Sequence, residues 1–134
     1  MADYDIIDAH LHVYDLEFKS KIPNQNWSHG FPSEASEASI CMNIPQELAK
    51  QVAGQSGVKK AIFVMCYDDS PEEAQWVYDN AQKTDFFVAI VAGLDLTKHE
   101  TLVAKIDEFR ANFKSPKFVG IRHHINYNED LLFR

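Results

Sequence analysis

The hydrophobic pattern of this chain alternates between two periods. Continuous apolar runs such as Ala61–Cys66 and Phe86–Leu94 have no polar face, which is typical of strands buried in a parallel sheet. Segments with apolar residues three and four positions apart separate these runs and predict amphipathic helices. Strands are expected at 6–13, 59–66, 86–94 and 117–125, and helices at 46–53, after Pro71 and after Thr97.

The predicted helices have recognisable starts and buried faces. Ser70-Pro71-Glu72-Glu73 and Thr97-Lys98-His99-Glu100 each match a capping box, and Pro45 stands before the first helix, which Gly54 and Gly57 end. The expected buried positions are Leu48, Ala49 and Val52, then Ala74, Val77, Tyr78 and Ala81, then Leu102, Ile106, Phe109 and Phe113.

Strands that alternate with helices predict an α/β fold with a parallel sheet and right-handed crossovers. Four strands and three helices match the N-terminal half of a (β/α)8 TIM barrel. An open doubly wound sheet is the alternative, although no glycine-rich phosphate motif follows the first strand. The polar stretch 14–43 predicts a long binding loop or lid, in which Trp27 is expected to pack onto the body of the domain.

The composition of the chain limits the classes of partner that we expect it to bind. The 134 residues carry a formal net charge of −7 and no basic stripe, so nucleic acid is not expected as a partner. No apolar run is long enough to span a bilayer, and Met1–Asp5 lacks the features of a signal peptide. Cys41 and Cys66 suggest neither a disulfide framework nor a metal knuckle. A cytoplasmic chain without a membrane partner is the simplest interpretation.

The first strand carries the most specific candidate chemistry. His10 and His12 are two residues apart, so their side chains project from the same face, together with Asp8. Two imidazoles about 6–7 Å apart along a strand can converge on one metal ion. Solvated or hydrogen-bonded histidines are the alternative interpretation.

The last strand supplies a second group. Arg122 shares a face with Gly120 and His124, whereas His123 lies on the other face unless the strand ends there. An arginine at the carboxyl end of a barrel strand can hold a carboxylate or a polarised carbonyl oxygen, and a salt bridge is the alternative. Asp95, just past the third strand, is expected to serve a turn.

Two segments resemble a known family. Ile6-Ile7-Asp8-Ala9-His10-Leu11-His12-Val13-Tyr14-Asp15 resembles the first strand of the amidohydrolase superfamily, and Phe118-Val119-Gly120-Ile121-Arg122-His123 is similar to a strand of its amidohydrolase-related branch. That branch includes fuconolactonase-like and dicarboxylate lactonases. The intervening segments 57–64 and 91–95 are similar too, so the resemblance covers nearly the whole chain.

The resemblance implies a TIM-barrel hydrolase that acts on a lactone, ester or amide bond of a small molecule, with a lactonase favoured, or a decarboxylase. It places metal ligands at His10 and His12, with zinc the expected divalent ion where one is present. Metal-independent lactonases also occur in this branch. Arg122, His123 and His124 are then expected to bind substrate.

The chain departs from the family pattern in one respect. Family members carry further histidines on the fifth and sixth strands and an aspartate on the eighth, which acts as general base. Residues 1–134 are therefore expected to form a partial barrel without a catalytic residue of their own, the base lying beyond Arg134. Alternatives are a TatD-like metallohydrolase or nuclease, and a non-catalytic dimerising or regulatory module. A homo-oligomer remains open, and the sequence does not identify the substrate.

Overall fold

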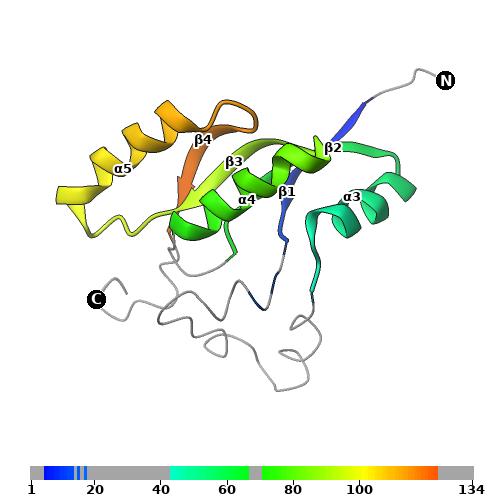
Figure 1. The fold of residues 1–134 in the computed structure, drawn as a ribbon, viewed down its shortest axis with the longest axis horizontal. Coiled ribbons are helices and arrows are strands. Elements are labelled where there is room, and N and C mark those ends of the chain that lie inside the picture. The colour runs from blue at the N-terminus through cyan, green and yellow to red at the C-terminus, as the bar shows by residue number, and fades with distance from the viewer. Residues whose placement is uncertain (1–4, 14, 16, 18–42, 67–70, 124–134) are drawn as a thin grey trace, which may run out of the picture.

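A computed structural model describes residues 5–13, 15, 17, 43–66 and 71–123 (Figure 1). The strands are β1 (Ile6–Leu11), β2 (Val58–Val64), β3 (Phe87–Gly93) and β4 (Lys117–Arg122). The helices are α3 (Gln46–Gln55), α4 (Pro71–Thr84) and α5 (His99–Asn112). Their order along the chain confirms the predicted alternation of strands and helices.

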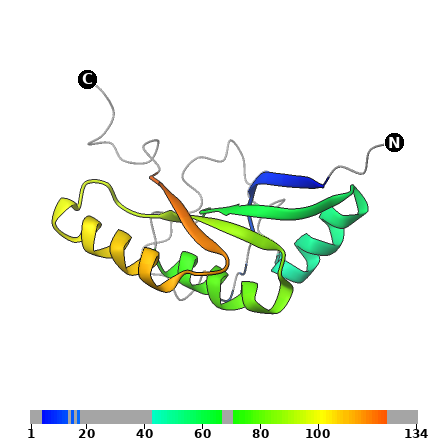
Figure 2. The same cartoon turned by 90° about the horizontal axis from the view of Figure 1, so that it is seen from above.

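The four strands form one parallel sheet in the order β1-β2-β3-β4. All three helices lie on the same face of this sheet (Figure 2). A doubly wound sheet reverses its strand order at a switch point, where the helices change to the other face. Within the described residues the order does not reverse, so the arrangement is that of sequential βα units.

The strands are shorter than the apolar runs predicted. β1 ends at Leu11 rather than Val13, and β2 ends at Val64 rather than Cys66. β4 ends at Arg122. The strand was expected to continue to Ile125, which lies outside the described residues. Nearly all of the predicted loop 14–43 also lies outside them. The apolar pattern continues past β1 and β2 because residues that follow these strands belong to the core: Val13 and Met65 are fully buried.

The core lies between the helices and the two central strands. Phe63 of β2 and Ile90 of β3 are fully buried, and Phe109 of α5 is stacked on Phe113 with ring centroids 4.7 Å apart. Tyr78 of α4 stacks on Phe113 at 4.4 Å, which joins the two helices. These contacts confirm the predicted inner faces of α4 and of the end of α5.

The inner face of α3 differs from the prediction. Ala49 is buried as expected, but Leu48 and Val52 are exposed, and Gln46 is buried in their place. Gln46 donates from Nε2 to the carbonyl of Val77 at 2.9 Å and accepts a hydrogen bond from the Thr84 hydroxyl. The helix thus presents an amide that binds the middle of α4 at Val77 and its end at Thr84, and these bonds satisfy the buried polar atoms of Gln46. The predicted end of this helix at residue 53 was wrong, because α3 continues through Gly54 to Gln55.

The start of α5 also differs from the prediction. Lys98 is the N-cap residue and makes no side-chain capping bond, so Thr97 does not close a capping box. The Thr97 hydroxyl instead donates to Asp95 Oδ1 at 2.6 Å. At α4, Pro71 is the first helical residue, as predicted, while Ser70 lies outside the described residues. In the described part of the chain, no helix is both long and apolar enough to cross a membrane.

Candidate metal and substrate site

The end of β2 is held by three side chains from three other elements. His12, just after β1, binds the Val64 carbonyl through Nδ1 at 2.8 Å. Arg122 of β4 donates from Nη1 to the carbonyl of the next residue, Met65, at 2.8 Å. Glu73 of α4 accepts the Cys66 N–H at 3.0 and 3.2 Å through its two carboxylate oxygens. Consecutive backbone groups of one segment therefore set the positions of a histidine and an arginine from opposite edges of the sheet.

The two histidines converge, as their spacing predicted. The Nε2 atoms of His10 and His12 are 3.3 Å apart, and their rings meet nearly at right angles, with centroids 4.8 Å apart. Asp8 Oδ1 accepts the backbone N–H of His10 at 2.9 Å and so fixes the backbone directly before His10. Because His12 donates its Nδ1 proton to Val64, its Nε2 carries the lone pair that faces His10.

This spacing fits a divalent ion. Two nitrogens bound to a tetrahedral zinc at 2.0–2.1 Å lie about 3.3–3.4 Å apart. The hydrogen bond from Nδ1 to a backbone carbonyl is the usual way in which a ligating histidine is oriented. Among the described residues, no group of three or more His, Cys, Asp or Glu side chains could hold a metal ion, so a metal ion at this pair would need ligands from elsewhere.

The surroundings keep His12 neutral. Burial lowers its pKa below the ordinary value of 6.5, and the nearby positive charges of His10 and Arg122 lower it further. The Val64 carbonyl and Asp8 oppose this shift without cancelling it. A neutral imidazole is the form that binds metal, so the environment favours the ligand state at neutral pH.

Arg122 lies where the sequence placed it. Gly93 is its register partner on β3, and Gly120 pairs with Val91 two positions earlier. A Cβ at Gly120 would make an ordinary van der Waals contact with the Val91 side chain at 3.7 Å, so this position packs on Val91 without crowding. The sequence suggested a salt bridge as the alternative role, but the partner shown is the Met65 carbonyl. A guanidinium has five N–H donors, so this bond leaves donors for an anionic or carbonyl oxygen.

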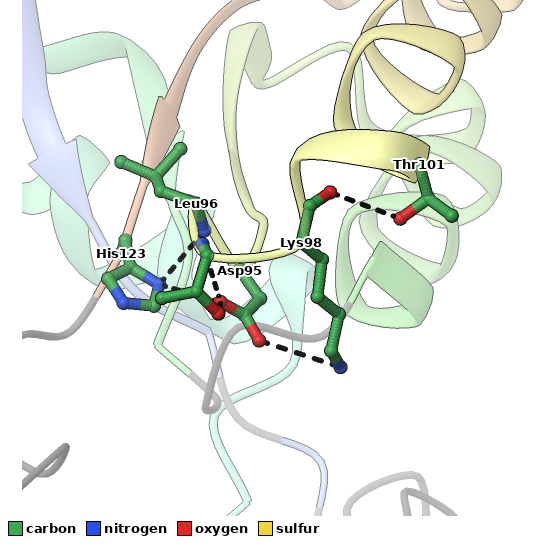
Figure 3. Close-up of polar contacts among 6 residues, drawn as sticks. Asp95, Leu96, Lys98, Thr101 and His123 are labelled. Atoms are coloured by element: carbon green, nitrogen blue, oxygen red, sulfur yellow. Dashed lines mark hydrogen bonds and ion pairs between the residues drawn. The ribbon is translucent and has the colours of Figure 1, made fainter. Parts of the chain in front are cut away.

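His123 belongs to a neighbouring cluster at the same edge of the sheet (Figure 3). Its side chain is only 6% exposed, and its Nδ1 lies 4.0 Å from Asp95 Oδ1. The Leu96 N–H donates to the same nitrogen at 3.4 Å. His123 therefore packs against the segment that follows β3. His124 lies outside the described residues, so its predicted role in substrate binding is not described.

Asp95 has the turn role that the sequence predicted. Its Oδ1 accepts hydrogen bonds from the N–H of Thr97 at 2.9 Å and from the Thr97 hydroxyl, and Oδ2 lies 3.5 Å from Lys98 Nζ (Figure 3). Partial burial opposes its ionisation, but these hydrogen bonds and the Lys98 charge outweigh it and lower the pKa of Asp95 below 3.8. An ionised Asp95 thus stabilises the connection beside His123.

Sequence reasoning missed the role of Glu73. It was interpreted as the last residue of a capping box, yet its side chain is fully buried and binds Cys66 at the end of β2. A signal was present: a carboxylate in the first turn of a helix that directly follows a strand can reach the N–H groups at that strand's end.

Comparison of the chain with protein-family models, with curated proteins and with solved structures finds no match.

Proposed function

We propose that this chain is one half of a (β/α)8-barrel hydrolase of the amidohydrolase-related type, and that His10 and His12 hold a divalent metal ion. The observation that carries the proposal is the 3.3 Å separation of the two Nε2 atoms, with His12 oriented through Nδ1 by the Val64 carbonyl. A pair of histidines that is merely solvated has no need of such an anchor. The substrate class is a small molecule with a lactone, ester or amide bond, and a lactone is favoured.

The architecture supports the part of this proposal that concerns the barrel fold. The strands follow one another in sequence order, and the helices all lie on one face. This is the arrangement of a singly wound barrel, whose active site forms at the carboxyl ends of the strands. His12, Arg122 and His123 all stand at that end of β1 and β4.

Each side chain of the site has a separate task in this proposal. When bound, the metal ion supplies Lewis-acid polarisation of the carbonyl that is to be attacked. His10 and His12 hold the ion, and Arg122 orients the substrate by donating to a carboxylate or carbonyl oxygen. The proposal assigns the general base to a later strand of the complete barrel, outside these 134 residues.

Zinc titration of the chain tests the metal site. Isothermal titration calorimetry is expected to show one zinc per chain, and His12→Asn is expected to lower the affinity by at least about 100-fold, more than the loss of an outer residue costs. His99→Asn is the matched control, because His99 is exposed in the first turn of α5. Equal zinc affinities for the wild type and His12→Asn would contradict the proposal.

The reaction is tested on the product of the complete reading frame. A panel of small lactones, esters and amides is assayed with and without a chelator, and Arg122→Lys is compared with the wild type. We expect lactone hydrolysis in which Arg122→Lys raises KM, because lysine cannot reproduce the planar donor fork. A complete product that binds zinc through His10 and His12 but hydrolyses none of these bonds would refute the assignment of the reaction.

A further inference from the structure

Two candidate binding groups are attached to neighbouring carbonyls at the end of β2. His12 binds the Val64 carbonyl through Nδ1 at 2.8 Å, and Arg122 donates from Nη1 to the Met65 carbonyl at 2.8 Å. Consecutive Cα atoms are about 3.8 Å apart, so groups that bind consecutive carbonyls lie on the order of 10 Å from each other. Side chains from the first and the last strand of the sheet order are thereby brought close together.

Hydrogen bonds fix the backbone to which these two groups are attached. The Met65 N–H donates to the Val91 carbonyl of β3 at 2.9 Å, and the Cys66 N–H donates to the buried carboxylate of Glu73. The separation between the histidine pair and Arg122 is therefore set by bonded backbone and not by mobile side chains alone.

Arg122 differs from other cations of the chain in its partner. Lys60 lies 2.9 Å from a carboxylate oxygen of Asp85, and Lys98 lies 3.5 Å from one of Asp95. Among the ion pairs of the described residues none includes Arg122, whose hydrogen-bond partner is a neutral backbone carbonyl. Because the guanidinium is partly buried, its charge is screened less than a surface charge would be.

The charge of Arg122 acts on the histidine pair. Burial lowers the pKa of His12, and the charges of His10 and Arg122 lower it further. Arg122 would repel a divalent ion on this pair about twice as strongly as a single positive charge at the same place. An anion bound to Arg122 would cancel the charge that causes this repulsion, so a cation on the pair and an anion on the arginine should favour each other's binding.

We propose that His10, His12 and Arg122 form one binding unit, in which a divalent cation on the histidine pair and a carboxylate on Arg122 bind cooperatively. This inference rests on the metal site of the proposed function and goes beyond it by coupling that site to the arginine. The planar donor fork of the guanidinium holds the two oxygens of a carboxylate. Hydrolysis of a lactone, ester or amide also releases a carboxylate, so the proposed reaction itself supplies a group of this class.

The coupling is reciprocal. If the carboxylate raises the zinc affinity by some factor, zinc raises the carboxylate affinity by the same factor, and factors of about 5 to 150 are typical of coupled sites. Without the anion Arg122 should weaken zinc binding, and with the anion bound this penalty should disappear. The effect of Arg122 on zinc affinity therefore depends on the anion, which is not expected of a residue with a purely structural role.

Zinc affinity in two buffers tests the coupling in the product of the complete reading frame. Zinc is titrated in competition with a chromophoric chelator, in acetate and in chloride of the same ionic strength, with acetate as the probe carboxylate. The wild type is expected to bind zinc at least about 5-fold more tightly in saturating acetate. Acetate titrated with and without zinc should show the same factor. Equal zinc affinities in the two buffers overturn the proposal.

Variants of Arg122 separate its charge from its hydrogen bond. Arg122→Gln removes the charge but keeps an amide N–H that can donate to the Met65 carbonyl. It is expected to bind zinc about 5-fold or more tightly than the wild type in chloride and to lose the acetate effect. Arg122→Lys keeps the charge and should retain the acetate effect. Weaker zinc binding by Arg122→Gln in chloride, or an acetate effect that survives in this variant, overturns the proposal.

Lys83→Gln is the matched control, because it removes the same charge from an exposed position in the last turn of α4. Its zinc affinity should equal that of the wild type in both buffers. A gain like that of Arg122→Gln would reveal a general effect of net charge and overturn the proposal. The two proposals fail differently: a wild type that binds no zinc in either buffer refutes the metal site and this inference with it, whereas zinc binding that ignores acetate refutes the coupling alone.

Discussion

The central and the outer strands of this sheet are built from similar residues but have different surroundings. β2 and β3 are covered on both sides by neighbouring strands and on one face by helices, and Ala61, Phe63, Ile90 and Ala92 are fully buried. Within the described part of the chain, β1 and β4 each pair with only one strand, and Ile6, Ile7 and Val119 are exposed. Yet the outer strands and the residues directly after them carry His10, His12, Arg122 and His123.

The central strands contribute mainly to stability, whereas the outer strands carry the side chains of the candidate site. The central strands supply the buried area, and the carbonyls at the end of β2 orient His12 and Arg122 from either side. The outer strands contribute side chains whose geometry depends on that support. Changes in the central strands should therefore affect folding and site together, while changes at the outer edges should leave the fold of a single chain intact.

The largest effect is expected at the centre of the core. Phe63→Ala removes a fully buried ring that meets Phe87 edge to face, with centroids 5.8 Å apart, and should lower the free energy of unfolding by about 3–5 kcal/mol. Urea unfolding followed by circular dichroism measures this loss. Val119→Ala, at dilute chain concentration, should stay within about 0.5 kcal/mol of the wild type. Equal losses at the two positions would contradict the distinction between central and outer strands.

A smaller loss is expected from the support under the site. Glu73→Ala leaves the Cys66 N–H without its carboxylate acceptor and should cost about 1–3 kcal/mol in unfolding free energy. Because Cys66 follows the carbonyls that bind His12 and Arg122, zinc affinity should also fall, by about 10-fold or more. Glu73→Gln keeps an acceptor oxygen and should retain part of both. An unchanged zinc affinity in Glu73→Ala would show that the end of β2 does not depend on this residue.

The connection between β3 and α5 should contribute less. Thr97→Val removes the hydroxyl that donates to Asp95 Oδ1 at 2.6 Å and should cost about 0.5–1.5 kcal/mol. Thr101→Val is the control, because its hydroxyl makes only a 3.4 Å contact to the Lys98 carbonyl on an exposed surface. Thermal unfolding of both variants compares the two contributions, and a larger loss for Thr101→Val would refute this assignment.

The smallest effect is expected in the pH dependence of stability. His12 has a pKa below 6.5 in the folded chain, so the unfolded chain binds more protons as the pH falls through 6.5 towards the folded value. Stability should therefore be unaffected by His12 above pH 6.5 and should decrease below it. His12→Asn should flatten this decrease in urea unfolding series, while His99→Asn should not. A wild-type profile that is flat below pH 6.5 would contradict the lowered pKa.

Much of the fold could be predicted from local patterns. The apolar run around Ile62 and the spacing of Ala74, Val77 and Ala81 depend on neighbours along the chain, and both elements formed as expected. The faces of α3 could not be predicted in this way, since Leu48 and Val52 are apolar but exposed, whereas the polar Gln46 is buried. Burial there depends on which strands and helices lie alongside, which a local pattern does not report.

The candidate site shows the same division. The convergence of His10 and His12 was expected from the two-residue repeat of a strand, although His12 lies just beyond β1 and the pairing of β1 is irregular between Asp8 and Leu11. Arg122 was expected at the carboxyl end of β4. The role of Glu73 was missed because a carboxylate three residues after a serine matches a capping box equally well. Its contact with Cys66 requires the end of β2 to lie beside the first turn of α4.

The sequence by itself therefore determined the alternation of strands and helices, the shared face of the two histidines, and the position of Arg122 at a strand end. These properties depend on backbone periodicity, which residue order sets directly. Only the tertiary structure decided which carbonyls hold His12 and Arg122, the lowered pKa of His12, and which apolar side chains stay exposed. Those properties arise from segments more than fifty residues apart in the chain, as between His12 and Val64, and only packing brings them together.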